Sequence, residues 1–269
     1  MSTDEKQTFS REEVQGLQDL RMGFLEHLGE LRRRLIISII AVVAAFAVSW
    51  IFVEEIFLFL QQPLIIAAPQ EHMAALHQAD MAEVFFTALK AALLAAVFLA
   101  SPVILFQIWK FIAPGLYPNE KKAVLPFMFM GTVCFFVGAA FCYYMVIPLG
   151  YGFLFDFSES FADPVLMIQD YFALTTKLLL AFGIVFELPV ATYFLSAIGL
   201  VTHRMLIKQW RIAVVVAFIL AAILTPPDVI TQALLAGPMI LLYAISIGIA
   251  YLQTTRRERE REAAEEQEI

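Results

Sequence analysis

The sequence predicts an all-α polytopic membrane protein in which six transmembrane helices, several of them kinked, form a curved concave wall. Hydrophobic residues make up 61% of the 269 residues and charged residues only 16%, with a mean hydropathy of +0.77. A soluble domain carries about a quarter charged residues. The apolar residues form six runs, and lysine and arginine gather in every second connection between them. The bilayer must therefore be the solvent for most of this chain.

Each apolar run is a candidate span, because a helix needs about 20 largely apolar residues to cross the hydrocarbon core. Prolines inside or near the ends of the runs predict kinks, since neighbouring helices can satisfy the carbonyl groups that proline frees. Bent helices favour a curved wall over a straight bundle. The predicted spans are residues 35–53, 84–112, 123–150, 171–201, 212–224 and 229–252, and the prolines are Pro102, Pro126, Pro148, Pro189 and Pro238.

The distribution of positive charge predicts the orientation. Lysine and arginine precede the first span, separate the second from the third and the fourth from the fifth, and follow the sixth. The alternate connections carry only acidic charges, so the positive-inside rule places both termini in the cytoplasm. The predicted organisation is a cytoplasmic segment with an amphipathic leader helix (1–34), a six-helix transmembrane domain (35–252) and a charged cytoplasmic tail (253–269).

The fifth span is unusually short. Residues 212–224 would make a helix of roughly 20 Å, against about 30 Å of hydrocarbon, and the helix breakers Thr-Pro-Pro-Asp follow at once. We expect a short helical hairpin that reaches the far side only where the bilayer thins. The alternative is that its polar ends sit deeper in the membrane, packed on neighbouring helices.

The approach to the first span carries the first motif. Leucine and phenylalanine recur at helical spacing from Leu20 to Leu35, which predicts an amphipathic helix that runs into the membrane. Glu30 lies on this helix. It either pairs with Arg33 or Arg34, three or four positions later, or faces a groove and receives a cation from a partner.

The second motif closes the second span and reads SPVILFQIWKFIAPGLYPNEKK over residues 101–122. Its Ala-Pro-Gly-Leu-Tyr-Pro segment predicts a stiff, non-helical cytoplasmic loop that presents Glu120. Trp109 and Tyr117 are aromatic residues of the kind found at membrane interfaces. The alternative for Glu120 is a solvated loop carboxylate that is offset by the two lysines after it.

Two further motifs bring polar residues into the membrane. Glu187, in Phe-Glu-Leu-Pro-Val, lies in the middle of the fourth span, where a charge costs roughly a few kcal/mol. It is therefore functional, or is held neutral by neighbouring hydroxyls or amides. The turn LTPPDVITQ places Thr225 and Gln232 between the last two spans, where Gln232 alternatively serves only as a hydrogen-bonding link between helices.

In this order, the four motifs resemble those of the TatC family, the signal-peptide-receptor subunit of the twin-arginine protein translocase. The resemblance runs over residues 24–252. It implies that Glu30 and Glu120 recognise the paired arginines of a signal peptide, with Arg32 and Phe111 in the same binding region. A guanidinium offers carboxylates a planar fork of donors that lysine cannot copy, so this chemistry suits the residues.

The resemblance also implies a role for the polar residues deeper in the membrane. Glu187 would lie on the concave, partly hydrated face, and Thr225 and Gln232 would form a docking site for single-span partners of the TatA/TatB type. The implied activity is export of folded proteins across the plasma (inner) membrane, powered by the proton-motive force. The implied partners are twin-arginine signal peptides, TatA/TatB-type proteins and membrane lipids, in an oligomeric assembly.

Other functions have less support. The sequence lacks a Gly-rich phosphate loop and a His-Glu-x-x-His pair, and no folded stretch gathers a basic face, so we expect no enzyme, cofactor, metal or nucleic-acid site. Cys134 and Cys142 lack metal or redox spacing and are interpreted as small buried hydrophobes. The main rival is a secondary transporter of a small solute that uses Glu187, although no internal repeat is evident. An intramembrane enzyme using Glu187 would lack a nucleophile or metal partner.

Overall fold

The protein is a bundle of long helices. The residues that the computed structural model describes are 11–67, 76–112, 124–159, 161, 165–225 and 228–267, and side chains are described over 28–67, 76–111, 128–158, 161, 165–225 and 228–256. Every regular element within these ranges is helical, apart from an isolated β-bridge between His77 and Met167. The predicted all-α fold is thereby confirmed.

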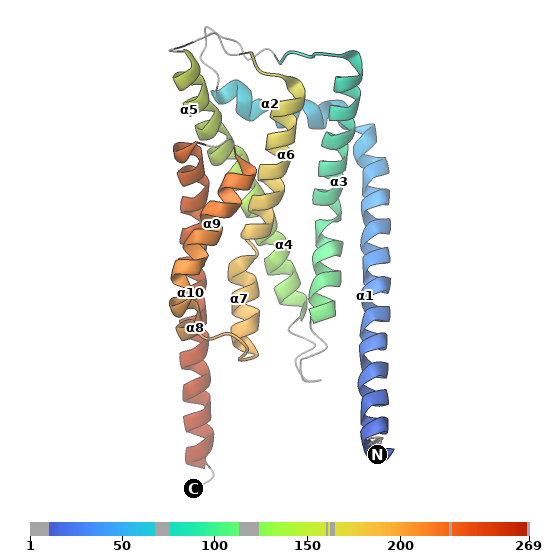
Figure 1. Ribbon diagram of the computed structural model, residues 1–269, viewed down its shortest axis with the longest axis vertical. Helices are drawn as coiled ribbons and strands as arrows, with labels where there is room; N and C mark the ends of the chain where they lie inside the picture. Colours follow the sequence, from blue (N-terminus) through green and yellow to red (C-terminus); the bar gives the residue numbers. More distant parts are fainter. Residues whose placement is uncertain are drawn as a thin grey trace, which may run out of the picture.

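The first three helices form one side of the bundle. Helix α1 (Arg11–Ile51) is continuous, so the predicted leader and the first span are one helix. Helix α2 (Val53–Ala67) lies across one end, and α3 (Met81–Ile112) returns antiparallel to α1 (Figure 1). We call the end where α2 lies the upper end. The end where α1 begins and α3 finishes is the lower end, as drawn in Figure 1.

The middle of the chain contains two irregular helices. Helix α4 (Val124–Phe141) continues through a π-helical turn, η3 (Cys142–Val146), into α5 (Ile147–Glu159). Helix α6 (Ile168–Val185) ends at Phe186, and α7 (Leu188–Ala197) resumes the same span. Pro189 lies in the first turn of α7, so the kink that this proline predicts is confirmed as a helix break.

The last three helices complete the bundle: α8 (His203–Lys208), α9 (Trp210–Leu224) and α10 (Val229–Gln267). Helix α10 packs against α7 and α9 and extends beyond them at the lower end (Figure 1). The beginning of α1 and the end of α10 therefore lie at the same end of the molecule. This arrangement fits an even number of crossings.

The helices confirm the predicted apolar runs. Within the described residues, five helical stretches are long and apolar enough to cross a membrane, namely Leu28–Ile51, Met81–Phe111, Met128–Ser158, Ile168–Ala197 and Val229–Arg256. The predicted short fifth span corresponds to α9, an apolar helix of only 15 residues. Large apolar side chains cover the outside of the bundle, as expected for a surface in contact with lipid.

Two glycines bring α4 and α6 into close contact where these helices cross. A Cβ added to Gly138 would lie 2.6 Å from the carbonyl oxygen of Phe182, and one added to Gly183 would lie 2.6 Å from Cε2 of Phe135. Each glycine thus leaves space for the helix that faces it: Gly138 of α4 for the backbone of α6, and Gly183 of α6 for the Phe135 ring of α4. Without a hydrophobic force between helices in lipid, such close backbone approach is a main source of association energy. Small residues hold the centre of this wall together.

The two cysteines are free thiols. Cys142 is fully buried, as expected for a small hydrophobe. Cys134 is only partly buried, beside the aromatic cluster of Phe135 and Trp109. The prediction of a buried side chain was therefore wrong for this residue. Cys134 faces a cluster of rings at the edge of the core and not its centre.

Candidate functional site

The lower end brings α1 level with the end of α3. Ala45 of α1 packs with Ala96 and Ala100 of α3, and nearer the upper end the rings of Trp50 and Phe85 lie 6.1 Å apart. Because the two helices are antiparallel and rise equally per residue, the same register continued downward sets residue 30 level with the last turn of α3. The part of the second motif that contains Glu120 follows that turn in the chain.

Glu30 holds a guanidinium from its own helix. Its Oε1 accepts a hydrogen bond from Nη2 of Arg34, one turn later, in an ion pair. The alternative that Glu30 pairs at i+4 is therefore confirmed, with Arg34 and not Arg33 as the partner. The Arg34 side chain is only 10% exposed, whereas that of Glu30 is 37% exposed. Glu30 is thus the outward-facing member of the pair.

Arg34 depends on Glu30 electrostatically. Its Nε is buried and has no hydrogen-bond partner within the described residues, and its guanidinium pairs with the carboxylate of Glu30. A largely buried charge that loses its partner destabilises a protein more than the pair stabilises it. Any substitution of Glu30 therefore has a structural effect that must be separated from an effect on binding.

The other predicted signal-peptide residues differ in their surroundings. Arg32 and Arg33 are exposed on α1, beside a shallow depression that Gly29, Ile36 and Ile37 also line. Phe111 is half-buried in the last turn of α3. The ammonium group of Lys110 lies 5.5 Å from the ring centre of Phe106, a cation–π distance. Glu120 and Tyr117 lie outside the described residues.

Glu187 occupies the break between α6 and α7. A Cβ on Gly131 of α4 would lie 3.0 Å from Oε2 and 3.4 Å from Oε1 of Glu187, and 3.3 Å from Nε1 of Trp109. Gly131 therefore leaves the space that the carboxylate occupies. Both carboxylate oxygens are buried and accept no hydrogen bond from any described residue, so the expected neighbouring hydroxyl or amide is not found there.

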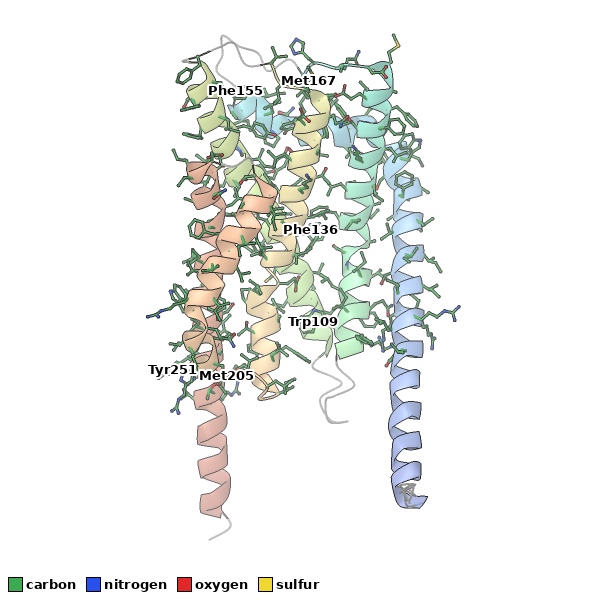
Figure 2. All side chains as sticks on the ribbon, viewed as in Figure 1. Trp109, Phe136, Phe155, Met167, Met205 and Tyr251 are labelled. Atoms are coloured by element: carbon green, nitrogen blue, oxygen red, sulfur yellow. The ribbon has the colours of Figure 1, made fainter. Side chains whose placement is uncertain are left out.

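Trp109, predicted to be an interface aromatic, is buried between helices and does not face lipid. It is 6% exposed and packs edge-on against Phe194 of α7, with ring centres 5.0 Å apart. Leu105, Phe135 and Val190 complete this cluster. Figure 2 shows Trp109 at the lower end of α3, where its ring joins α3 to the wall. The interface interpretation was wrong because the aromatic pattern alone does not tell a lipid-facing ring from one that faces α7.

The turn between α9 and α10 is organised by a residue that sequence reasoning passed over. Asp228 accepts a hydrogen bond from the backbone N–H of Thr231 at 2.6 Å and another from its hydroxyl, which caps α10. The Thr225 hydroxyl donates to the carbonyl of Ala221 at 2.8 Å. Gln232 is half-buried, and no hydrogen bond joins its side chain to another helix within the described residues. An aspartate three positions before a threonine was the available signal.

A second unpredicted contact joins the upper connections. The Glu83 carboxylate accepts the backbone N–H of Ala79 at 2.7 Å and that of Gln169 at 3.1 Å. Nearby, His77 N–H donates to Leu166 at 3.0 Å and Ile168 N–H donates to His77 at 2.9 Å. Figure 2 shows Met167 at this upper end, far from Trp109. The sequence indicates Glu83 only as an acidic charge, because one of its two partners, Gln169, lies 86 positions away in the chain.

Comparison with known proteins identifies the family. The family described as "Sec-independent protein translocase protein (TatC)" matches residues 26–238. The chain is 42% identical to the TatC protein of Koribacter versatilis, covering 91% of each chain. It is 44% identical to that of Magnetococcus marinus, covering 90% of this chain and 88% of the relative. A crystal structure of the twin-arginine translocase receptor TatC superposes with a TM-score of 0.77 at 39% identity, covering 85% of this chain and 99% of that one.

These relatives confirm the resemblance seen in the four motifs. None of them is a small-solute transporter, so the rival function finds no support among them. They are components of a protein translocase and not enzymes, and the apolar helices make the protein a multi-pass membrane protein. The chain belongs to the TatC family of Sec-independent protein translocases.

Proposed function

We propose that this protein is the receptor subunit that captures twin-arginine signal peptides at its lower end, with Glu30 and Glu120 each gripping one arginine. The outward-facing carboxylate of Glu30, which already holds a guanidinium, carries the proposal. In this proposal the lower end faces the cytoplasm of a plasma (inner) membrane. The positive charges of Arg32 and Arg33 on that surface support this orientation.

The Glu30–Arg34 pair shows the chemistry that the proposed receptor needs. A carboxylate has about four lone-pair sites, so it accepts a second guanidinium beside the one it holds. Arg34 is buried behind Glu30, which leaves the more exposed side of the carboxylate toward the surface. An incoming arginine would then share or replace the internal one. In the empty receptor, Arg34 orients the carboxylate.

Glu120 supplies the second acid in this proposal. Glu120 lies in the sequence between the end of α3 at Ile112 and the start of α4 at Val124, and the register of α1 against α3 sets residue 30 level with that end of α3. Arg32 and Phe111 flank the same region. Arg32 would repel isolated cations and so restrict binding to a well-placed pair of arginines. Phe111 would contact the apolar residues of the peptide.

A peptide-binding assay on the full-length protein in lipid nanodiscs tests the proposal. Glu30→Gln and Glu120→Gln should each weaken binding of a twin-arginine peptide by roughly tenfold or more, the loss typical of a charge-assisted hydrogen bond. Glu54→Gln is the matched control, because Glu54 is an exposed helical carboxylate in the first turn of α2, at the upper end. A twin-lysine peptide should bind weakly to every variant.

Arg34→Gln separates binding from helix stability. If Glu30 grips the peptide, removal of its internal competitor should leave affinity unchanged or raise it. If Glu30 serves only to neutralise Arg34, Arg34→Gln should restore normal binding to the Glu30→Gln variant, since no unpaired buried charge remains. That restoration would overturn the proposed role of Glu30.

We further propose that TatA/TatB-type single-span proteins dock beside Thr225 and Gln232, and that Glu187 contacts the deeper part of the signal peptide or a partner helix. The docking proposal is supported by the short helix α9, which ends at this turn near the upper end. The proposal for Glu187 is supported by its two carboxylate oxygens, which are buried and accept no hydrogen bond from the described residues. Assembly would be oligomeric, with transport powered by the proton-motive force. Photocrosslinking from position 232 should give an adduct with such a partner, and an adduct from Tyr251 alone would contradict this docking site.

A further inference from the structure

Helix α2 contains a proline where a helix is normally unbroken. Pro63 lies inside α2 and is fully buried, together with Leu60 and Leu64. Proline has no backbone N–H, so the carbonyl of Phe59, four positions earlier, loses its helical donor. A buried carbonyl that lacks a donor costs free energy comparable to a lost hydrogen bond. Some other group must therefore satisfy the backbone of α2.

Two tyrosines from distant parts of the chain bond to this turn of α2, and Tyr143 supplies the donor that Pro63 lacks. The Tyr143 hydroxyl donates to the carbonyl of Phe59 at 2.6 Å, and the Tyr171 hydroxyl donates to that of Leu60, also at 2.6 Å. The Tyr143 ring stacks on the Phe59 ring at 4.5 Å with an angle of 7°. Tyr171 is fully buried in the main core. Both hydroxyls thus bond to the turn of α2 that precedes Pro63.

The π-helical turn explains how Tyr143 reaches α2. Residues 142–146 form η3, where an extra residue per turn changes the direction of the side chains that follow. Within this turn Cys142 and Tyr143 are buried, whereas the adjacent Tyr144 is 68% exposed. π-helical turns are rare overall, but many of those that occur lie at functional positions. Here one tyrosine bonds to α2, whereas its neighbour Tyr144 is exposed at the mouth of the cavity that both residues line.

We infer that Tyr143 and Tyr171 are positioning residues that hold α2 as a fixed wall of an apolar cavity in the bundle. The cavity has a volume of about 510 Å³. Phe59 and Leu60, whose carbonyls the tyrosines bind, both line it, and so does Tyr143 itself. The opposite walls come from α3, α4 and α6, including Phe136, which Figure 2 shows at mid-height. The two hydroxyls therefore hold the wall of the cavity that α2 forms.

Hydrogen exchange on the full-length protein in nanodiscs of phosphatidylethanolamine and phosphatidylglycerol tests the inference. Tyr143→Phe keeps the ring and its stacking but removes the hydroxyl, so amides of α2 from Phe59 to Ala67 should exchange roughly tenfold faster, as expected when a buried carbonyl is left unsatisfied. Tyr171→Phe should act in the same direction. Tyr144→Phe is the matched control, because its ring is exposed and adjacent, and it should change nothing.

Pro63→Ala distinguishes a positioning role from general packing. Alanine restores the N–H that bonds to the Phe59 carbonyl, so Tyr143→Phe should accelerate exchange in α2 much less in the Pro63→Ala background. An equal acceleration in both backgrounds, or an equal effect of Tyr144→Phe, would overturn the inference. Exchange in α10 reports global unfolding, and if Tyr171→Phe fails to fold, the Tyr143 and Pro63 pair decides the outcome.

Discussion

The two ends of the bundle are built differently. At the upper end, hydrogen bonds join elements that are far apart in the chain: Glu83 binds Gln169, and Tyr171 binds the carbonyl of Leu60. At the lower end, the ion pair of the described residues joins Glu30 to Arg34 within one turn of one helix. The upper end is thus braced between connections near α2 and α3. At the lower end a hydrogen bond from the Tyr243 hydroxyl to the Leu206 carbonyl joins α10 to α8, whereas the charged pair of α1 lies within one helix. A receptor surface on α1 fits this difference, since the described ion pair lies within that one helix.

The crossing between the two ends should be the most sensitive part of the molecule. Gly138→Ala places a methyl group against the backbone of Phe182, so α4 and α6 must move apart, and stability should fall by about 1–3 kcal/mol. Thermal unfolding in detergent measures the loss. Gly150→Ala is the control, because nothing lies within 4 Å of its added Cβ. Equal unfolding temperatures for the two variants would contradict close packing at this crossing.

The cap of α10 should have the next largest effect. Asp228→Ala removes the acceptor for the Thr231 N–H and hydroxyl, and should destabilise the upper turn by about 1 kcal/mol. Asp228→Asn retains an acceptor and should restore most of that stability. Thermal unfolding compares the three proteins. A loss as large in Asp228→Asn as in Asp228→Ala would show that charge, and not capping, is what matters.

Loss of the Glu83 contact should loosen the upper end locally. Glu83→Ala removes the acceptor shared by Ala79 and Gln169, so their amides should exchange severalfold faster while those of α9 stay unchanged. Glu55→Ala provides the control, because Glu55 is an exposed carboxylate in the first turn of α2. If exchange at Gln169 is the same in both variants, the upper connections are held by the His77–Met167 bridge alone.

The smallest effect on stability should come from the lower end. Arg34→Gln removes a guanidinium whose pairing is local to α1, and such i,i+4 pairs contribute about 0.2–0.5 kcal/mol in exposed helices. The unfolding temperature should therefore change little, and because Arg34 is largely buried the loss should depend only weakly on salt. A loss comparable with that of Gly138→Ala would mean that the lower end is braced like the upper end.

Much of the fold could be predicted from local patterns. Apolar runs are properties of neighbouring residues, and the helices that they predict are found in the structure, including the short α9. The break at Glu187 also followed from a local signal, since Pro189 cannot donate to the carbonyl four positions earlier. The Glu30–Arg34 pair was one of two stated alternatives, because side chains one turn apart meet on a helix.

Contacts between distant segments could not be predicted in this way. Nothing near Tyr143 in the sequence indicates that its hydroxyl binds Phe59, 84 positions earlier. The burial of Trp109 depends on α7, and the space for the Glu187 carboxylate depends on Gly131 in α4. One sequence records the residue types at these positions but not which faces meet. Helix packing in three dimensions decides the rest.

A double-mutant cycle between the peptide and the lower end tests the receptor account most directly. Peptides with two arginines, or with either arginine replaced by lysine, would be titrated against the full-length protein and its Glu30→Gln and Glu120→Gln variants. The account predicts that each carboxylate couples to one arginine by about 1.5 kcal/mol or more, so the second change on the same pair costs little. Strictly additive losses at both carboxylates would contradict it.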